Sequence, residues 1–276
     1  MNPSKTANEL TFWEHLDVLR GCLIRVIAVT VACAVVAFLL KDQVFALLLA
    51  PKEPDFVTFR WLHDVSLCLF PDFGGISPFS VKLINTGLAQ QFLIHMQASL
   101  YVGIICASPY IIYVLFRFVS PALYARERKY AYGVVGGGYV MFALGVLLNY
   151  FLIFPLTFRF LGTYQVAAEV DNFITLQSYM DTLATMSLML GVVFEIPVVS
   201  FLLAKFGLIS SAIMSRFRRH AIIAILLVAA IITPTSDAFT LMLVAVPIWL
   251  LYEASILLVR FAHRFAFFSF LMLPCL

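Results

Sequence analysis

Long apolar segments are the feature that most constrains the fold of this chain. A helix rises about 1.5 Å per residue, so roughly 20 mainly apolar residues cross the ~30 Å hydrocarbon core of a bilayer. Charged residues make up only 12% of the chain, against about 25% in soluble domains, so lipid must be its solvent. The pattern predicts an all-α, polytopic membrane protein with six transmembrane helices: Leu23–Leu40, Leu93–Phe116, Ala131–Phe154, Thr182–Ala204, Ala221–Ile232 and Ala238–Val259.

The fifth segment is the shortest of the six. It holds about 12 uncharged residues before Thr233-Pro234, so we expect local thinning of the bilayer or shelter behind longer neighbours. Only Thr233–Asp237 separates it from the sixth segment, which predicts a tight helical hairpin. The chain has no repeat of fixed period and no low-complexity linker, and we therefore expect one integral-membrane domain over residues 1–276.

Basic residues are distributed unevenly between the loops, and their placement predicts the orientation. Lysines and arginines gather on the cytoplasmic side of membrane proteins. With a cytoplasmic N-terminus, the outer side holds only Lys41, Lys52, Arg60, Lys82 and Arg159. The inner side then holds the other thirteen: Lys5, Arg20, Arg25, Arg117, Arg126, Arg128, Lys129, Lys205, Arg216, Arg218, Arg219, Arg260 and Arg264. Both termini are therefore expected in the cytoplasm, with the protein in the bacterial inner membrane.

The longest loop, from about Lys41 to Gln90, is expected on the outer side. Its apolar run Val44–Leu49 is followed by Pro51, which predicts an interfacial helix stopped by proline. The first 40 residues differ from a cleaved signal peptide, because the region before the apolar stretch is long and acidic.

Catalytic and metal-binding patterns are missing from the sequence. The five cysteines have no CxxC or Cys/His metal spacing, and HExxH is absent. We therefore predict no enzymatic activity, no cofactor and no metal site. The net charge of +3 gives no indication of nucleic-acid binding.

Glu195 is the polar residue that most needs an explanation, because it lies near the middle of the fourth segment. An ionised carboxylate at that depth costs about 2.5–3.5 kcal/mol, so it is expected to be protonated or to bond a polar partner on another helix or chain. A structural helix–helix contact and a role in partner docking or substrate lining both remain open. Glu253 is expected to be a satisfied carboxylate near the inner interface, and His95 and Gln97 are expected to hydrogen-bond other helices.

Small residues and prolines predict the shape of the bundle. The run Gly136-Gly137-Gly138 and Gly145 allow close approach between helices. Prolines in or beside the segments predict bent helices and a concave, glove-like bundle. These prolines are Pro109, Pro121, Pro155, Pro197, Pro234 and Pro247.

The inner loop after the second segment mixes one acid into a basic run. Glu127 stands between Arg126 and Arg128-Lys129. A positive-inside anchor explains the arginines and leaves Glu127 unexplained. A carboxylate at this level can hold a guanidinium through paired charge-assisted hydrogen bonds, which suits an arginine-bearing peptide.

Several of these stretches resemble motifs of the TatC family. The stretch His15–Arg20 (HLDVLR) is similar to its entry motif HLxELRxRL, and Phe118–Tyr124 followed by Arg126-Glu127 is similar to its first cytoplasmic loop, FxxPALYxxE. Four later stretches match family motifs in the same order: Ala107–Pro109, Phe194–Pro197, Thr233-Pro234 with Asp237, and Ala245–Pro247 through Glu253. The resemblance runs from about Leu10 to Arg260.

The resemblance implies a receptor and core subunit of the twin-arginine translocation system. Such a subunit binds twin-arginine signal peptides and, with single-span TatA/TatB-type subunits in a hetero-oligomer of several copies, supports transport of folded proteins driven by the proton-motive force. By match of motif, Glu127 and Phe118 would contact the signal peptide, with Asp17 and Arg20 of the entry motif. Glu195 would contact partner subunits. Pro51 and Asp237 match sensitive positions of the outer side.

The chain departs from the family pattern in two places. The acid of the entry motif aligns with Val18, while Asp17 beside it is turned by about 100° on a helix. The tail over residues 261–276 is apolar after Arg264, where a polar ending is expected. A second interpretation of the chain is a secondary transporter of small solutes, because such folds carry ionisable groups at mid-membrane depth. Glu195 fits that interpretation, but no inverted repeat supports it.

Overall fold

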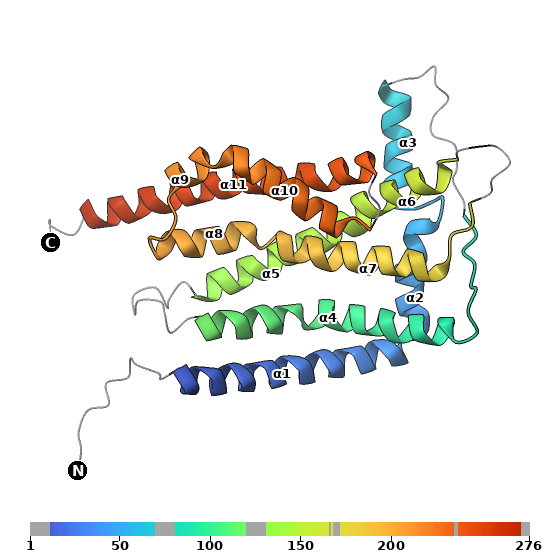
Figure 1. Cartoon of the computed structure of the whole chain (residues 1–276), viewed down its shortest axis with the longest axis horizontal. Helices are drawn as coiled ribbons and strands as arrows, with labels where there is room; N and C mark the ends of the chain where they lie inside the picture. Colours follow the sequence, from blue (N-terminus) through green and yellow to red (C-terminus); the bar gives the residue numbers. More distant parts are fainter. Residues whose placement is uncertain are drawn as a thin grey trace, which may run out of the picture.

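The computed structural model describes residues 12–69, 81–119, 131–165, 167, 172–234 and 237–271. Within these ranges the chain is helical apart from connecting segments and one isolated bridge between Ile84 and Thr175 (Figure 1). The helices are α1 (Phe12–Leu39), α2 (Lys41–Leu49), η1 (Ala50–Lys52), α3 (Val57–Leu69), α4 (Gln90–Val119), α5 (Ala131–Leu148), η5 (Asn149–Ile153), α6 (Phe154–Thr163), α7 (Leu176–Val193), α8 (Ile196–Lys205), α9 (Ser211–Arg216), α10 (Arg218–Ile232) and α11 (Ala238–Leu271).

Five of the predicted spans correspond to helical segments that are long and apolar enough to cross a bilayer. Among the described residues these are Leu16–Leu39, Gln90–Phe118, Gly133–Thr163, Leu176–Lys205 and Ala238–Phe261. The remaining predicted span, Ala221–Ile232, lies in α10, which has 15 residues. At 1.5 Å per residue α10 is about 22 Å long, which falls short of the ~30 Å hydrocarbon core.

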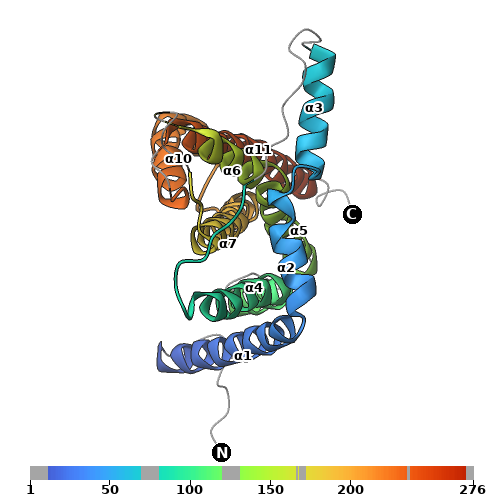
Figure 2. The same cartoon turned by 90° about the vertical axis from the view of Figure 1, so that its right-hand side faces the viewer.

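The spans lie side by side in an open arrangement. α1 packs chiefly on α4, α4 on α5 and α7, and α8 on α11, while α10 lies against α11. Seen along the spans, α1 is at one edge, and α10 and α11 are at the other (Figure 2). We call the end with the start of α1 and the end of α11 the terminal end, and the end with α2, α3 and α6 the distal end (Figure 1).

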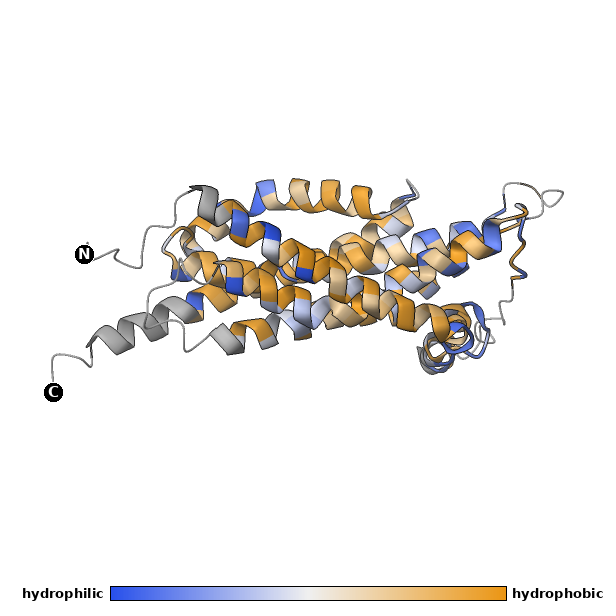
Figure 3. Cartoon of the chain, turned by 90° about the horizontal axis from the view of Figure 1, so that it is seen from below, coloured by the Kyte–Doolittle hydropathy of each residue, from blue (hydrophilic) through white to orange (hydrophobic). Residues whose placement is uncertain are grey.

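The outer surface of the spans is apolar, as lipid contact requires. Large apolar side chains such as Leu23, Ile27 and Ile231 are more than half exposed. In Figure 3 apolar residues dominate the middle of the spans, and most hydrophilic residues lie toward their ends. This distribution is the one expected for helices surrounded by hydrocarbon.

Two spans are interrupted, and both interruptions are followed by a proline. The third span passes through the π-helical turn η5 before Pro155, and the fourth breaks at Phe194-Glu195 before Pro197. Pro109 and Pro247 lie inside the helices α4 and α11, which continue through them. A proline removes a single backbone hydrogen bond, and neighbouring turns can carry the helix through. Pro234 follows the end of α10, and Pro121 lies outside the described residues.

Glycines set the closest helix contacts, but only some of the predicted ones do so. A Cβ added to Gly103 of α4 would lie 2.8 Å from the backbone of Ala34 in α1, and one on Gly145 of α5 would lie 2.8 Å from the carbonyl oxygen of Leu190 in α7. Gly136 and Gly137 have no described atom within 4 Å of such a Cβ, so the prediction of close packing was wrong for them. The run is helical, and its members therefore face different sides.

Helix α2 covers the core at the distal end. Val44 and Leu48 are buried there, Tyr179 donates a hydrogen bond to the carbonyl of Leu48 (3.0 Å), and Tyr150 donates one to the carbonyl of Leu47 (2.7 Å). The helix and its end near Pro51 agree with the sequence. Its buried side chains, Val44 and Leu48, pack on the protein core, and its other face carries the exposed Leu47.

Candidate functional site

The first candidate region is the terminal end of α1 and α4, which run antiparallel. Ala34 lies against Gly103, and equal steps from this crossing toward the terminal end bring Arg20 of α1 level with Arg117 of α4. Asp17 and Arg20 are exposed, and Phe118 is half-buried. The structure therefore brings three of the predicted signal-peptide residues, Asp17, Arg20 and Phe118, to the same end of the bundle.

Arg25 shows how α1 places a basic side chain within an apolar span. Its Nη2 lies 3.8 Å from the Cβ position of Gly21, so the guanidinium reaches back toward the terminal end. Long basic side chains reach interfacial water in this way. Val18 is 45% exposed, so an apolar side chain stands at the surface position where the family motif has an acid. Glu127 lies outside the described residues.

The second candidate region is Glu195, at the break between α7 and α8. Its backbone joins the two helices, since its N–H donates to the carbonyl of Val192 (3.1 Å) and its carbonyl accepts from Val199 (2.9 Å). The side chain points at α5, where Oε2 lies 3.1 Å from the Cβ position of Gly138. Ile112 of α4 contacts the same position.

The carboxylate of Glu195 has an unsatisfied oxygen. Oε1 is buried, and no described residue donates a hydrogen bond to it. Buried polar atoms are nearly always bonded, so such an exception needs a reason. Within the described residues the polar partner expected from the sequence is missing. The alternatives that remain are a protonated side chain and a partner on another chain.

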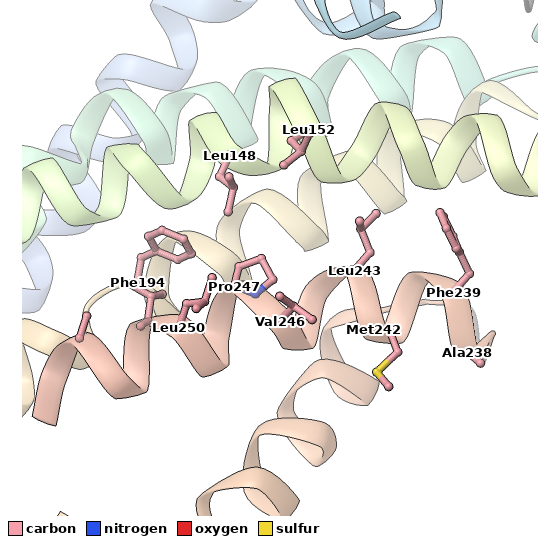
Figure 4. A pocket seen from close by; sticks show the side chains of 12 residues that line it. Leu148, Leu152, Phe194, Ala238, Phe239, Met242, Leu243, Val246, Pro247 and Leu250 are labelled. Atoms are coloured by element: carbon pink, nitrogen blue, oxygen red, sulfur yellow. The ribbon is translucent and has the colours of Figure 1, made fainter. Parts of the chain in front are cut away.

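An apolar groove of about 1040 Å³ lies beside this break (Figure 4). Leu148 and Leu152 line one side, Met242, Val246 and Pro247 of α11 line the other, and Phe194 reaches in next to Glu195. Its lining is apolar, so the groove suits hydrocarbon or the apolar face of a helix.

Pro51 and Asp237, which the sequence matched to sensitive positions of the family, both lie at the distal end and make structural contacts. Pro51 is buried in η1, directly after α2. Asp237 caps α11, because its Oδ1 accepts a hydrogen bond from the backbone N–H of Thr240 at 2.7 Å. A carboxylate at this position satisfies a helix donor that has no partner within the helix.

The sequence did not single out the polar cluster around Asp181. Gln97 of α4 donates to Asp181 Oδ1 at 2.5 Å, and Gln177 donates to both oxygens of Asp181 at 2.9 Å. The spacing of Gln177 and Asp181 by four residues was the available signal, because it puts both side chains on one helix face. The prediction that Gln97 bonds another helix is confirmed. The same holds for His95, whose Nε2 lies 3.2 Å from the carbonyl oxygen of Phe38.

A second buried contact was also missed. Asn149, in the π-helical turn, is fully buried and donates to Ser187 Oγ of α7 at 2.7 Å. At the terminal end, Arg218 and Glu253 form an ion pair of 2.7 Å between α10 and α11, which confirms the expected satisfied carboxylate. No group of three or more potential metal ligands occurs in the part of the chain that the structure describes.

Together, the fold and these groups define a polytopic helical membrane protein, with exposed charged side chains at one end and an unsatisfied carboxylate oxygen within the bundle. The family model described as "Sec-independent protein translocase protein (TatC)" matches residues 14–247. The chain belongs to the TatC family, whose members are components of a protein translocase and not enzymes. The resemblance seen in the motifs is confirmed, and the alternative of a small-solute transporter loses its support.

Relatives with this description cover most of the chain. The TatC protein of Blattabacterium sp. subsp. Periplaneta americana is 31% identical over 252 residues, covering 90% of this chain and 94% of its own length. That of Aquifex aeolicus is 33% identical over 254 residues, covering 91% and 95%. A crystal structure described as the twin arginine translocase receptor TatC is 32% identical, with a TM-score of 0.71, and covers 91% of this chain and 100% of that one.

Proposed function

We propose that this protein is the receptor and core subunit of a twin-arginine translocation system, which binds the signal peptides of folded precursor proteins. The observation that carries the proposal is the meeting of α1 and α4 at the terminal end. There Asp17 and Arg20 are exposed, and Phe118 lies next to the loop that contains Glu127. This is a site open to water at the edge of the membrane, as a peptide arriving from solution requires.

The chemistry of the proposed site suits two neighbouring arginines. Glu127 and Asp17 supply carboxylates, and a carboxylate binds the planar guanidinium with two parallel hydrogen bonds. Phe118 offers a ring face on which a guanidinium can stack. The family motif has an acid at the position of Val18, and in this chain the neighbouring Asp17 supplies the carboxylate instead.

Glu195 is proposed as the contact for single-span TatA/TatB-type subunits in a hetero-oligomer of several copies. Its unsatisfied buried oxygen and the adjacent apolar groove support this. A single transmembrane helix that carries one polar side chain would fill both: its apolar face would lie in the groove, and its polar group would bond Oε1.

We further propose an orientation with both termini in the cytoplasm, across the bacterial inner membrane. In this arrangement α10 is the sixth span, the whole chain 1–276 is one translocase domain with an apolar tail over residues 261–276, and transport is driven by the proton-motive force. The lysines and arginines at the terminal end support the orientation, because basic residues favour the cytoplasmic side. Pro51 and Asp237 then stabilise the outer side.

The test is peptide binding to the full chain in nanodiscs. We expect retention of a twin-arginine signal peptide, weaker retention of its Lys-Lys variant, and a roughly 10-fold or larger loss with Glu127→Gln, the size of a lost charge-assisted bond. Glu53→Gln, on the opposite side of the membrane, is the matched control and should bind normally. Equal retention of the two peptides would refute the proposed receptor function.

A further inference from the structure

Helix α3 is attached to the bundle through its first turn. The hydroxyl of Thr58 donates a hydrogen bond to the backbone carbonyl of Phe151 in η5. Phe59 is buried, and the guanidinium of Arg159 lies over its ring at 5.7 Å. Just before the helix, Phe56 stacks on Phe151 with ring centroids 5.8 Å apart. These contacts fix the direction in which α3 leaves the bundle.

That direction is crosswise to the spans. In Figure 1 the spans run horizontally and α3 stands upright near their distal ends. Figure 2 shows that α3 overhangs the edge of the bundle beside α11. Because the spans define the membrane normal, a helix crosswise to them near their ends lies in the plane of the membrane, at the boundary between hydrocarbon and headgroups. Beyond the edge of the bundle, the layer beneath it is lipid.

The two sides of α3 differ in polarity. With about 100° between successive residues, Trp61 and Leu62 point on average to one side, and Arg60 and His63 to the opposite side, which also carries the exposed Leu67. Trp61 is 58% exposed. Tryptophan is enriched where membranes meet water, because its ring is largely apolar and its N–H needs a polar partner.

We propose that α3 is an interfacial helix that rests on the lipid headgroup layer at the distal side of the membrane. Trp61 and Leu62 face the acyl chains, and Arg60 and His63 face the headgroups and water. The exposed face of α3 is occupied by lipid, since the helix overhangs the bundle at headgroup depth. Because its first turn is fixed to the bundle, such a helix sets the depth of the bundle in the membrane and resists tilting of the bundle, as interfacial anchors do. This role is independent of signal-peptide binding.

The test is the fluorescence of Trp61 in the full chain, reconstituted in phosphatidylcholine nanodiscs. The protein has three tryptophans, and Trp13→Phe with Trp249→Phe leaves Trp61 as the emitter. We expect blue-shifted emission that is quenched by lipids brominated on the acyl chain. Bromines near the headgroup should quench more strongly than bromines near the terminal methyl, and aqueous iodide should quench weakly.

The matched control moves the probe to the other face of the same helix. In the chain with Trp13→Phe, Trp61→Phe and Trp249→Phe, His63→Trp should give the reverse pattern, with strong quenching by iodide and weak quenching by brominated lipid. Equal iodide quenching at both positions would mean that α3 stands in water, and would overturn the proposal. Shielding of Trp61 from both quenchers would mean that protein covers it, and would overturn it as well.

Discussion

The distal and terminal halves of this protein use their polar groups in different ways. In the distal half, several polar side chains bond across helices: Tyr150 and Tyr179 to α2, and Gln97 to Asp181. Asp237 caps its own helix α11, and the buried hydroxyls of Thr157 and Thr240 have no hydrogen-bond partner among the described residues. In the terminal half, Asp17 and Arg20 are exposed with no ion-pair partner among the described residues, and Glu195 has an unsatisfied oxygen. The described contacts between helices in this half include the ion pair of Arg218 with Glu253 and the hydrogen bond from the hydroxyl of Tyr252 to the carbonyl of Met214.

We infer from this difference that the two halves have different functions. Satisfied polar networks make a protein rigid, whereas groups without internal partners are available to bind something else. Under the proposed function, the interhelical hydrogen bonds of the distal half stabilise the scaffold, and the exposed charges of the terminal half and the Glu195 region meet the ligands. Paired substitutions in the two halves test this contrast.

The largest effect is expected from adding bulk at the α1–α4 crossing. In Gly103→Leu the new Cβ would meet the backbone of Ala34 at 2.8 Å, which only separation of the helices can relieve. We expect a loss of about 1–3 kcal/mol in the free energy of unfolding, as in other overpacked cores. Gly136→Leu is the control, because no described atom lies within 4 Å of that position. Denaturant unfolding in detergent measures both, and equal losses would contradict the packing described here.

The next largest effect is expected when a carboxylate is removed from each half, Asp181 from the distal half and Asp17 from the terminal half. Asp181→Ala removes the acceptor of Gln97 and Gln177, and we expect a loss of about 1 kcal/mol in stability with normal signal-peptide affinity. Asp17→Ala should change stability by less than about 0.5 kcal/mol and lower the peptide affinity, because Asp17 is exposed. Unfolding and peptide binding measured on both variants separate scaffold from site. If both variants lost affinity alike, the division between the halves would fail.

A somewhat smaller loss is expected at the cap of α11. Asp237→Ala leaves the N–H of Thr240 without its acceptor, at a cost of about 1 kcal/mol or less in the free energy of unfolding. Asp237→Asn keeps a capping oxygen and should restore most of the stability. Thermal unfolding in detergent followed by circular dichroism is the measurement. Asparagine performing no better than alanine would show that the charge of Asp237 matters more than its cap.

The smallest change in stability is expected at Glu195. Glu195→Leu removes the unsatisfied oxygen at similar volume, so the isolated chain should be unchanged or more stable by at most about 1 kcal/mol. Crosslinking to single-span partner subunits should fall clearly, while signal-peptide affinity stays normal. Loss of stability with unaltered crosslinking would assign Glu195 a structural role only.

Part of the polar chemistry was predictable from the position of a residue along a predicted span. The acid Glu253 near an interface was expected to be satisfied, and Arg218 satisfies it. Asp181 was overlooked because it stands just before the predicted start of a span at Thr182, whereas the helical segment begins at Leu176. The direction of α3 had no signal in the sequence either, since it depends on a bond from Thr58 to a carbonyl in a distant helix.

By itself the sequence determined that this protein lives in lipid, that it is helical, where most of its spans lie, and to which family it belongs. Hydropathy and short motifs are properties of neighbouring residues, so they can be read along the chain. The tertiary structure alone decided which glycines touch a neighbouring helix, which prolines interrupt a span, and that Glu195 lacks a donor among the described residues. Those outcomes depend on the rotation and register of helices far apart in the chain, which no local pattern records.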